Sequence, residues 1–225
     1  MTADTTTARV VPVVRRNKAG RYKAAADVNT HSASHERGDN TARALGFRVA
    51  LRPEECEAWG VPYVDEHESG RGVRLFDAVT RLGDRVSVKE TRRPNPNHDT
   101  SHVITTPSER SIATTTAAIL RGAPVLVVAH RGTIDLDRIQ FRLLDVAPVL
   151  REAGGDVATI RDRTGAGRPG AGGSGTIWGK WVQRKNERGE LYGHYWEVSV
   201  SVRKLPWRWG TIEEIEREIH AMLHP

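Results

Sequence analysis

The chain has 225 residues, with 34 lysines and arginines against 28 aspartates and glutamates, which gives a net charge of +6. This length is enough to bury a full core, and the basic balance favours an anionic partner such as nucleic acid. A single cysteine, Cys56, excludes a disulfide framework and a cysteine zinc site. The start lacks a signal-peptide pattern and no apolar run reaches membrane-spanning length, so we expect a cytoplasmic protein with no membrane partner.

Residues 1–30 have the composition of a basic N-terminal arm. An apolar piece at 10–14 is followed by several cations, of which Arg15 and Arg16 are candidates to contact a phosphate backbone. Each cation that neutralises a phosphate adds counterion release to the affinity. A solubilising tail is the alternative interpretation.

The patterns after the arm predict an α/β core over residues 31–162. We expect, in chain order, a helix at 34–45 ended by Gly46, a strand at 47–51, a polar loop at 52–72 with a short helix at 53–59, a hairpin at 73–93, a loop at 94–99, a helix at 108–121, strands at 124–130 and 139–143, and a helical piece at 146–150. The run at 124–130 is apolar almost throughout, which is typical of a central strand buried on both faces. His98 and His102, placed in the loop after the hairpin, are either solvated or contact a metal or phosphate.

The hairpin at 73–93 carries charges where a hairpin alone needs none. Apolar residues alternate from Val86, and the same parity continues to Glu90 and Arg92, while Asp77 stands among the apolar residues of the first strand. A charge on an apolar face is costly to bury unless it is paired or binds an ion. The pattern therefore indicates either a metal site for phosphodiester chemistry or an apolar face that ends here in solvated charges.

In this order of elements the chain resembles the PD-(D/E)xK nuclease superfamily, within it the restriction endonuclease-like and Holliday junction resolvase-like branches. The likeness covers residues 34–150. The family's helix acid corresponds to Glu36 and its strand acid to Asp77. Its Glu-x-Lys motif corresponds to Glu90-Thr91-Arg92. The resemblance implies that Asp77 and Glu90 hold Mg²⁺, that a metal-bound water attacks the phosphodiester, and that Glu36 binds the metal or orients the water.

Two departures from the family pattern leave the site cation open. Arg92 stands in place of the lysine, and a guanidinium can orient or stabilise a phosphate but cannot serve as a base. An alternative register, Ser87-Val88-Lys89, restores the lysine but replaces the acid with serine and puts Lys89 on the opposite parity. Phe76 stands where the family has proline. The competing hypothesis is a nucleic-acid-binding protein that keeps a nuclease-like fold without catalysis.

Residues 163–176 form a glycine-rich linker or loop, and the composition then shifts. Strands at 176–183 and 191–202 predict a β-hairpin that is rich in tryptophan and cations. Aromatic rings can stack on bases while cations hold phosphates, and core packing is the alternative for some of the tryptophans. The candidate nucleic-acid contacts in this hairpin are Lys180, Arg184, Lys185 and Arg188.

The segment 177–225 closes with a helix that begins at a capping box formed by Thr211 and Glu214. Its apolar stripe must bury against the hairpin, the core or a second subunit. The sequence thus predicts an α/β fold, a mixed β-sheet core flanked by helices, with an appended basic β-hairpin and C-terminal helix. The expected function is a Mg²⁺-dependent DNA endonuclease; DNA versus RNA and a homodimer are left open.

Overall fold

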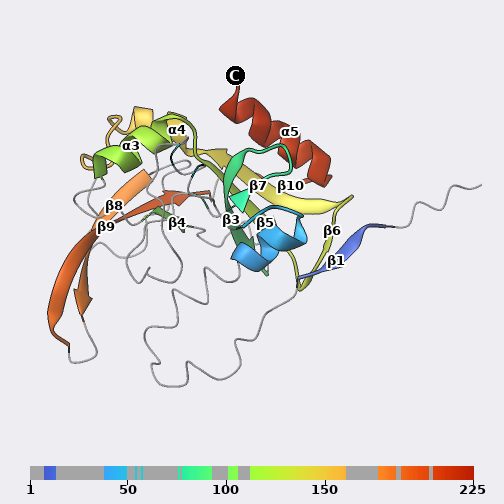
Figure 1. Cartoon of the computed structure of the whole chain (residues 1–225), viewed down its shortest axis with the longest axis horizontal. Coiled ribbons are helices and arrows are strands. Elements are labelled where there is room, and N and C mark those ends of the chain that lie inside the picture. Colours follow the sequence, from blue (N-terminus) through green and yellow to red (C-terminus); the bar gives the residue numbers. More distant parts are fainter. Residues whose placement is uncertain are drawn as a thin grey trace, which may run out of the picture.

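Figure 1 shows the computed structural model of the chain, which has the predicted α/β fold. The structure describes residues 8–13, 38–49, 54, 57, 76, 78–92, 101–105, 112–160, 177–185, 189–202 and 205–225. Within the strands at 101–105, 177–185 and 191–201, side chains are described at 104, 177–179 and 196–201. No helix in this described part of the chain is long and apolar enough to span a membrane.

A five-stranded mixed sheet forms the centre of the fold. Its order is β10 (Arg208–Gly210), β7 (Ile139–Asp145), β5 (Pro124–Ala129), β3 (Arg85–Thr91) and β2 (Ala78–Val79). β3 and β5 are parallel, and the other neighbours are antiparallel. A parallel pair needs a crossover connection, and α3 (Ile112–Leu120) lies in the one between β3 and β5.

The apolar run before His130 is the central strand β5, as predicted. Its side chains alternate between the two faces of the sheet. Leu126 and Val128 belong to a first apolar cluster, which also contains residues of a helix at 38–44 and of α5 (Ile212–Leu223). Val125 and Val127 belong to a second cluster, with residues of α3, of α4 (Val146–Glu152) and of a second sheet.

The second sheet has the order β4 (Ser101–Thr105), β9 (Leu191–Ser201) and β8 (Ile177–Lys185). The predicted hairpin is therefore confirmed as β8 and β9. Its Trp196 is buried in the second cluster, and the indole Nε1 donates to the carbonyl of Val157 at 2.7 Å. Strand β4 was not predicted. His102 lies in β4 and pairs with Val200, so its placement in a loop is wrong, because residues 101–105 pair along the edge of β9.

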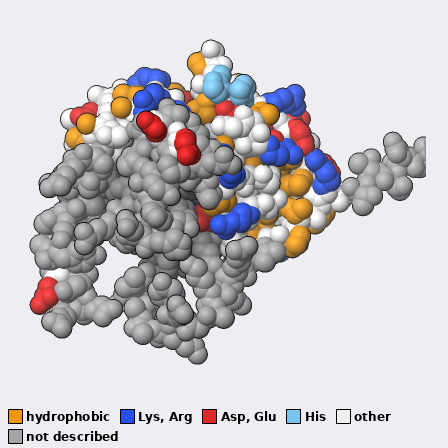
Figure 2. All heavy atoms as spheres, in the orientation of Figure 1, with side chains coloured by type: hydrophobic (Ala, Val, Ile, Leu, Met, Phe, Trp, Pro, Cys, Tyr) orange, Lys and Arg blue, Asp and Glu red, His pale blue; other side chains and the backbone are white. Residues whose placement is uncertain are grey.

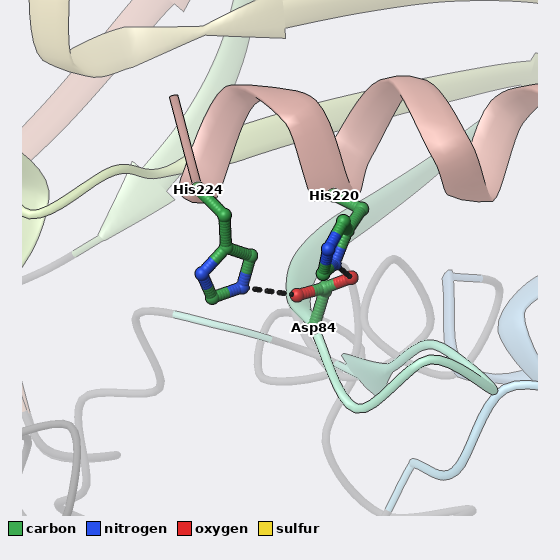
Figure 3. A group of neighbouring side chains, drawn as sticks. All are labelled: Asp84, His220 and His224. Carbon is green, nitrogen blue, oxygen red and sulfur yellow. Dashed lines mark hydrogen bonds and ion pairs between the residues drawn. The ribbon is translucent and has the colours of Figure 1, made fainter.

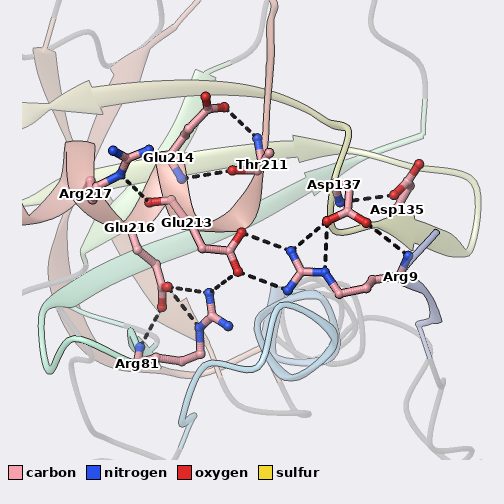
Figure 4. A network of polar contacts seen from close by, with 9 residues as sticks. All are labelled: Arg9, Arg81, Asp135, Asp137, Thr211, Glu213, Glu214, Glu216 and Arg217. Carbon is pink, nitrogen blue, oxygen red and sulfur yellow. Dashed lines mark hydrogen bonds and ion pairs between the residues drawn. The ribbon is translucent and has the colours of Figure 1, made fainter. Parts of the chain in front are cut away.

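The start of the described chain is docked rather than free, which corrects the expected arm at residues 9–13. β1 (Val10–Pro12) pairs with β6 (Thr133–Asp135), and Val13 is buried in the first cluster. The Arg9 guanidinium lies 2.7 Å from Asp137 Oδ1 and 3.0 Å from Glu213 Oε1. Figure 4 shows Arg9 between these two acids.

The first helix is held unusually close to β3. Residues 38–44 are helical and Gly46 has a φ of +81°, as expected for a glycine that ends a helix. A Cβ on Gly38 would lie 2.5 Å from the carbonyl oxygen of Val88, so only glycine fits there. Of the strand predicted at 47–51, the described residues 47–49 form one isolated bridge, between Arg48 and Val79, and Phe47 and Val49 are buried in the first cluster.

The last helix completes the core. The predicted capping box of Thr211 and Glu214 is present, and Ile212, Ile215 and Ile219 are fully buried in the first cluster. The apolar stripe of α5 therefore buries against the core, the second of the three possibilities that its sequence left open. β10, just before α5, adds the edge strand next to β7.

Candidate functional site

Glu90 and His130 lie together at the carboxyl ends of two parallel strands. Glu90 is near the end of β3, and His130 directly follows β5. The backbone N–H of His130 donates to the carbonyl of Thr91 at 3.0 Å, so the parallel pairing continues to this point. In open α/β sheets, ligands bind at this edge, where strands end and loops begin.

The two side chains are nearly buried and are joined by a threonine from the first helix. Glu90 Oε2 lies 3.1 Å from His130 Nε2, and these side chains are 7% and 4% exposed. The Thr41 hydroxyl donates to the same Oε2 at 3.3 Å and lies 3.0 Å from His130 Nε2. We name this group the Thr41–Glu90–His130 cluster.

The hydrogen bonds of His130 indicate which nitrogen of its imidazole carries the proton. The backbone N–H of Gly132 donates to His130 Nδ1 at 3.1 Å, so Nδ1 is the unprotonated nitrogen of a neutral ring. The proton is then on Nε2, which faces Glu90 and Thr41. The carboxylate of Glu90 therefore has a hydrogen-bond donor on each of two neighbouring elements, and its orientation is fixed.

The two candidate site cations, Lys89 in β3 and Arg92 directly after it, have different surroundings. Successive side chains of a strand point to opposite faces, so Lys89 faces away from Glu90, as its parity predicts. Lys89 is paired with Val127, which in turn is paired with Arg142, so these three residues form one row across the sheet on the side of the second cluster. Arg92 follows β3 and is exposed.

Arg142 is the buried cation of that row. Its guanidinium carbon lies 4.5 Å from the centroid of the Trp207 ring, and burial lowers the pKa of the guanidinium. A guanidinium stacked on an indole is stabilised by the ring's negative face. Trp207 is thus assigned to packing, whereas Trp209 is exposed on β10 with Arg138 stacked over it at 4.7 Å.

The other candidate residues lie where the structure describes no side chain. Asp77 and Glu36, the strand acid and the helix acid, fall outside the described residues, and so do Arg15, Arg16 and Arg188. Lys180, Arg184 and Lys185 lie in β8, of which only the backbone is described at these positions. The convergence of Asp77, Glu36 and Glu90 therefore stays a prediction.

Sequence reasoning missed Thr41 and His130. The signal for His130 was available: it directly follows a buried strand, and a β-helix-β connection makes that strand parallel to β3. No signal in the sequence points to Thr41, because its role depends on how closely the helix at 38–44 approaches β3.

The donor set at this edge is compatible with Mg²⁺. This ion takes oxygen ligands, keeps several waters, and is held in enzymes by one or two carboxylates together with substrate phosphates. Glu90 supplies one such carboxylate. Imidazole nitrogen is not a preferred ligand of Mg²⁺, which leaves His130 as the partner that orients the carboxylate.

The chain was compared with protein-family models, curated proteins and solved structures, and none of them matches it. Its function is therefore inferred from its own residues.

Proposed function

We propose that this protein is a metal-dependent endonuclease that hydrolyses phosphodiester bonds in DNA, with Glu90 as a metal ligand. The observation that carries the proposal is the nearly buried Thr41–Glu90–His130 cluster at the carboxyl edge of β3 and β5. A carboxylate fixed by two hydrogen-bond partners is pre-oriented, as metal ligands are. The net charge of +6 favours a polyanionic substrate.

The order of the described elements also supports the proposal. A helix at 38–44, the hairpin of β2 and β3, the helix α3 and the buried strand β5 come in the order expected of a nuclease-like core, with β4 of the second sheet inserted before α3. Glu90 lies on the second strand of that hairpin, at the end that meets β5.

Each residue of the cluster has one role in this proposal. Mg²⁺, when bound, supplies a Lewis acid for the phosphate and lowers the pKa of a water. Glu90 would hold the ion, while the His130 imidazole and the Thr41 hydroxyl keep its carboxylate in place. The remaining candidates are two acids, Asp77 and Glu36, and one phosphate-stabilising cation, Arg92, whereas Lys89 faces the other side of the sheet.

The test is cleavage of supercoiled plasmid by the full chain with Mg²⁺ or with EDTA. We expect nicked and linear products with Mg²⁺ only, and their loss in Glu90→Gln and Asp77→Asn. Glu218→Gln is the matched control, because Glu218 is a surface acid on α5 that pairs with Arg208 at 2.7 Å. Cleavage that persists in EDTA, or at the full rate in Glu90→Gln, would contradict the proposal.

A second function, nucleic-acid binding without catalysis, is favoured by the residue at position 92. Glu90 is already hydrogen-bonded within the protein by Thr41 and His130, and Arg92 stands where a nuclease of this kind has lysine. Salt-dependent binding of DNA by the wild-type protein, with no cleavage in Mg²⁺ or Mn²⁺, would select this second function.

A further inference from the structure

Asp84, His220 and His224 lie together, as Figure 3 shows. Asp84 directly precedes β3, whereas Glu90 is near the other end of that strand. His220 Nδ1 lies 3.0 Å from Asp84 Oδ2, and His224 Nε2 lies 2.9 Å from Asp84 Oδ1. The carboxylate is 4% exposed, whereas the two imidazoles are 51% and 58% exposed. We name this group the Asp84–His220–His224 cluster.

The fold brings these three residues together for identifiable reasons. Side chains four residues apart lie on one face of a helix, so His220 and His224 project together from the end of α5. Burial of the apolar stripe of α5 lays that end over the turn between β2 and β3. Thr80 fixes this turn, since its N–H donates to the Asp84 carbonyl at 2.7 Å and its Oγ1 accepts from the Asp84 N–H at 3.1 Å.

We infer that the Asp84–His220–His224 cluster binds a divalent transition-metal ion, with Zn²⁺ preferred over Mg²⁺. One ligand atom from each residue lies within 4.8 Å of the others. Ligand atoms about 2.0–2.2 Å from a tetrahedral Zn²⁺ are about 3.3–3.5 Å apart, so small side-chain rotations suffice to admit the ion. Two imidazoles and a carboxylate suit Zn²⁺, whereas Mg²⁺ takes oxygen ligands.

The exposure of the two imidazoles gives the ion a path from solvent. Figure 2 shows histidine side chains in one exposed patch over the end of α5. Three protein ligands leave the fourth tetrahedral position to water. The ion would replace the direct contacts of Asp84 with the two histidines. It would thereby link the end of α5 to the turn that precedes β3.

This site is separate from the Thr41–Glu90–His130 cluster. A strand rises about 3.3 Å per residue, which puts Asp84 and Glu90 roughly 20 Å apart along β3. Because the two sites prefer different metals and share no residue, the failure of one proposal leaves the other standing.

The sequence provides a matched control for a binding test. It contains three pairs of histidines four residues apart, at 31 and 35, at 98 and 102, and at 220 and 224. Spacing alone would let any pair bind Zn²⁺, but among the residues that the structure describes, His220 and His224 are the pair that shares one buried carboxylate, that of Asp84.

The experiment is calorimetric titration of the full chain with Zn²⁺ and, separately, with Mg²⁺. We expect His220→Asn and His224→Asn each to weaken one equivalent of Zn²⁺ binding by well over about tenfold, since loss even of an outer hydrogen-bond partner costs that much. The double variant His98→Asn/His102→Asn should bind as the wild type does. Equal Zn²⁺ affinity in the wild type and in both single variants would overturn the inference.

Thermal unfolding provides a second readout that does not depend on the heat of binding. An ion that binds only the folded chain raises its Tm, so Zn²⁺ should raise the Tm of the wild type and not that of His224→Asn. Both histidines are exposed, and circular dichroism without metal will show that these variants fold. The same rise in Tm for the wild type and His224→Asn would refute the site.

Discussion

The carboxylate of Glu90 and the imidazole of His130 meet across two parallel strands, with Oε2 and Nε2 3.1 Å apart. Register explains the meeting, because Glu90 is paired with Val128 and His130 comes two residues later on the same side of β5. Thr41, 89 residues from His130 in the sequence, completes the group from the first helix. A substitution at Thr41 or His130 should therefore change the orientation of the Glu90 carboxylate.

Replacing Thr41 with valine should lower cleavage while the protein stays folded. The substitution keeps the shape of the side chain but removes the hydroxyl that donates to Glu90 Oε2. Loss of a hydrogen-bond partner behind a metal ligand typically costs about 10–100-fold in activity or metal affinity. Thr114→Val, at an exposed position of α3, is the control. A cleavage rate equal to that of the wild type would show that the hydroxyl does not position the carboxylate.

Gly38→Ala should destabilise the protein and displace the first helix. The added Cβ would lie 2.5 Å from the Val88 carbonyl oxygen, and this backbone atom cannot move aside as a side chain can. Overpacking of this kind costs about 1–3 kcal/mol, which urea unfolding will measure. Arg43→Ala, on the exposed side of the same helix, should cost much less. Equal midpoints for the two variants would contradict the close approach.

Arg81→Ala should destabilise the protein far more than Arg208→Ala. Arg81 binds Glu216, whose side chain is 4% exposed, with Nη2 2.6 Å from Oε2 (Figure 4). Breaking a buried pair costs about 3–5 kcal/mol, and we expect about 2 because Arg81 is itself partly exposed and its backbone N–H still donates to Glu216. Arg208 and Glu218 form a surface pair, which should contribute below about 1 kcal/mol. Denaturant titrations of both variants test the ranking.

Glu213 should contribute a pH-dependent part of the stability. Its hydrogen bonds with Arg9 lower the pKa of the Glu213 carboxyl to about 2 from its ordinary 4.5. A lowered carboxyl pKa stabilises the folded state fully above the unfolded value, and this contribution is lost as the pH falls through the folded value. The Tm of the wild type should therefore exceed that of Glu213→Gln at neutral pH, and the two should converge between pH 4.5 and 2.

The size of this effect is small because the pair is exposed and screened by salt. Glu152→Gln, an exposed acid at the end of α4, controls for the loss of one negative charge. A difference between wild type and Glu213→Gln that is constant from neutral pH to pH 2 would contradict the assignment.

The basic tip of the β8–β9 hairpin should contribute affinity for DNA and no chemistry. Reversal of Arg184, Lys185 and Arg188 to glutamate should reduce the slope of log K against log salt by about one for each lost phosphate contact. Charge reversal is preferable to deletion, because α5 and β9 are part of the core and truncation would unfold it. An unchanged slope in the folded triple variant would show that this tip does not touch DNA.

The sequence predicted the elements whose pattern is local. The apolar run of β5, the hairpin that contains β2 and β3, and the capping box of α5 each have a short-range signature, and all three are confirmed. The alternation along β3 also predicted that Glu90 and Lys89 face opposite sides of the sheet, because alternation is a property of the strand itself.

What could not be predicted depends on distant segments meeting. β4 is a strand because it pairs with the edge of β9. β1 is held in place because it pairs with β6. The Asp84–His220–His224 cluster joins a turn to a helix 136 residues away. Neither the sequence around Asp84 nor the sequence of the helix indicates by itself that the three residues meet. Thr41 joins the site through the close approach at Gly38, which is a matter of packing and not of propensity.

The place of α5 has a consequence for how the chain is made. α5 covers the first cluster on β3 and β5, but it is synthesised long after both strands. On the ribosome, the helix at 38–44 is available early, but the part of the first cluster that α5 covers stays open until residues 212–223 have emerged. Contacts between such distant segments fold slowly, and an open apolar face invites aggregation. A nascent chain arrested before α5 should therefore be a chaperone client, and the released full-length chain should not.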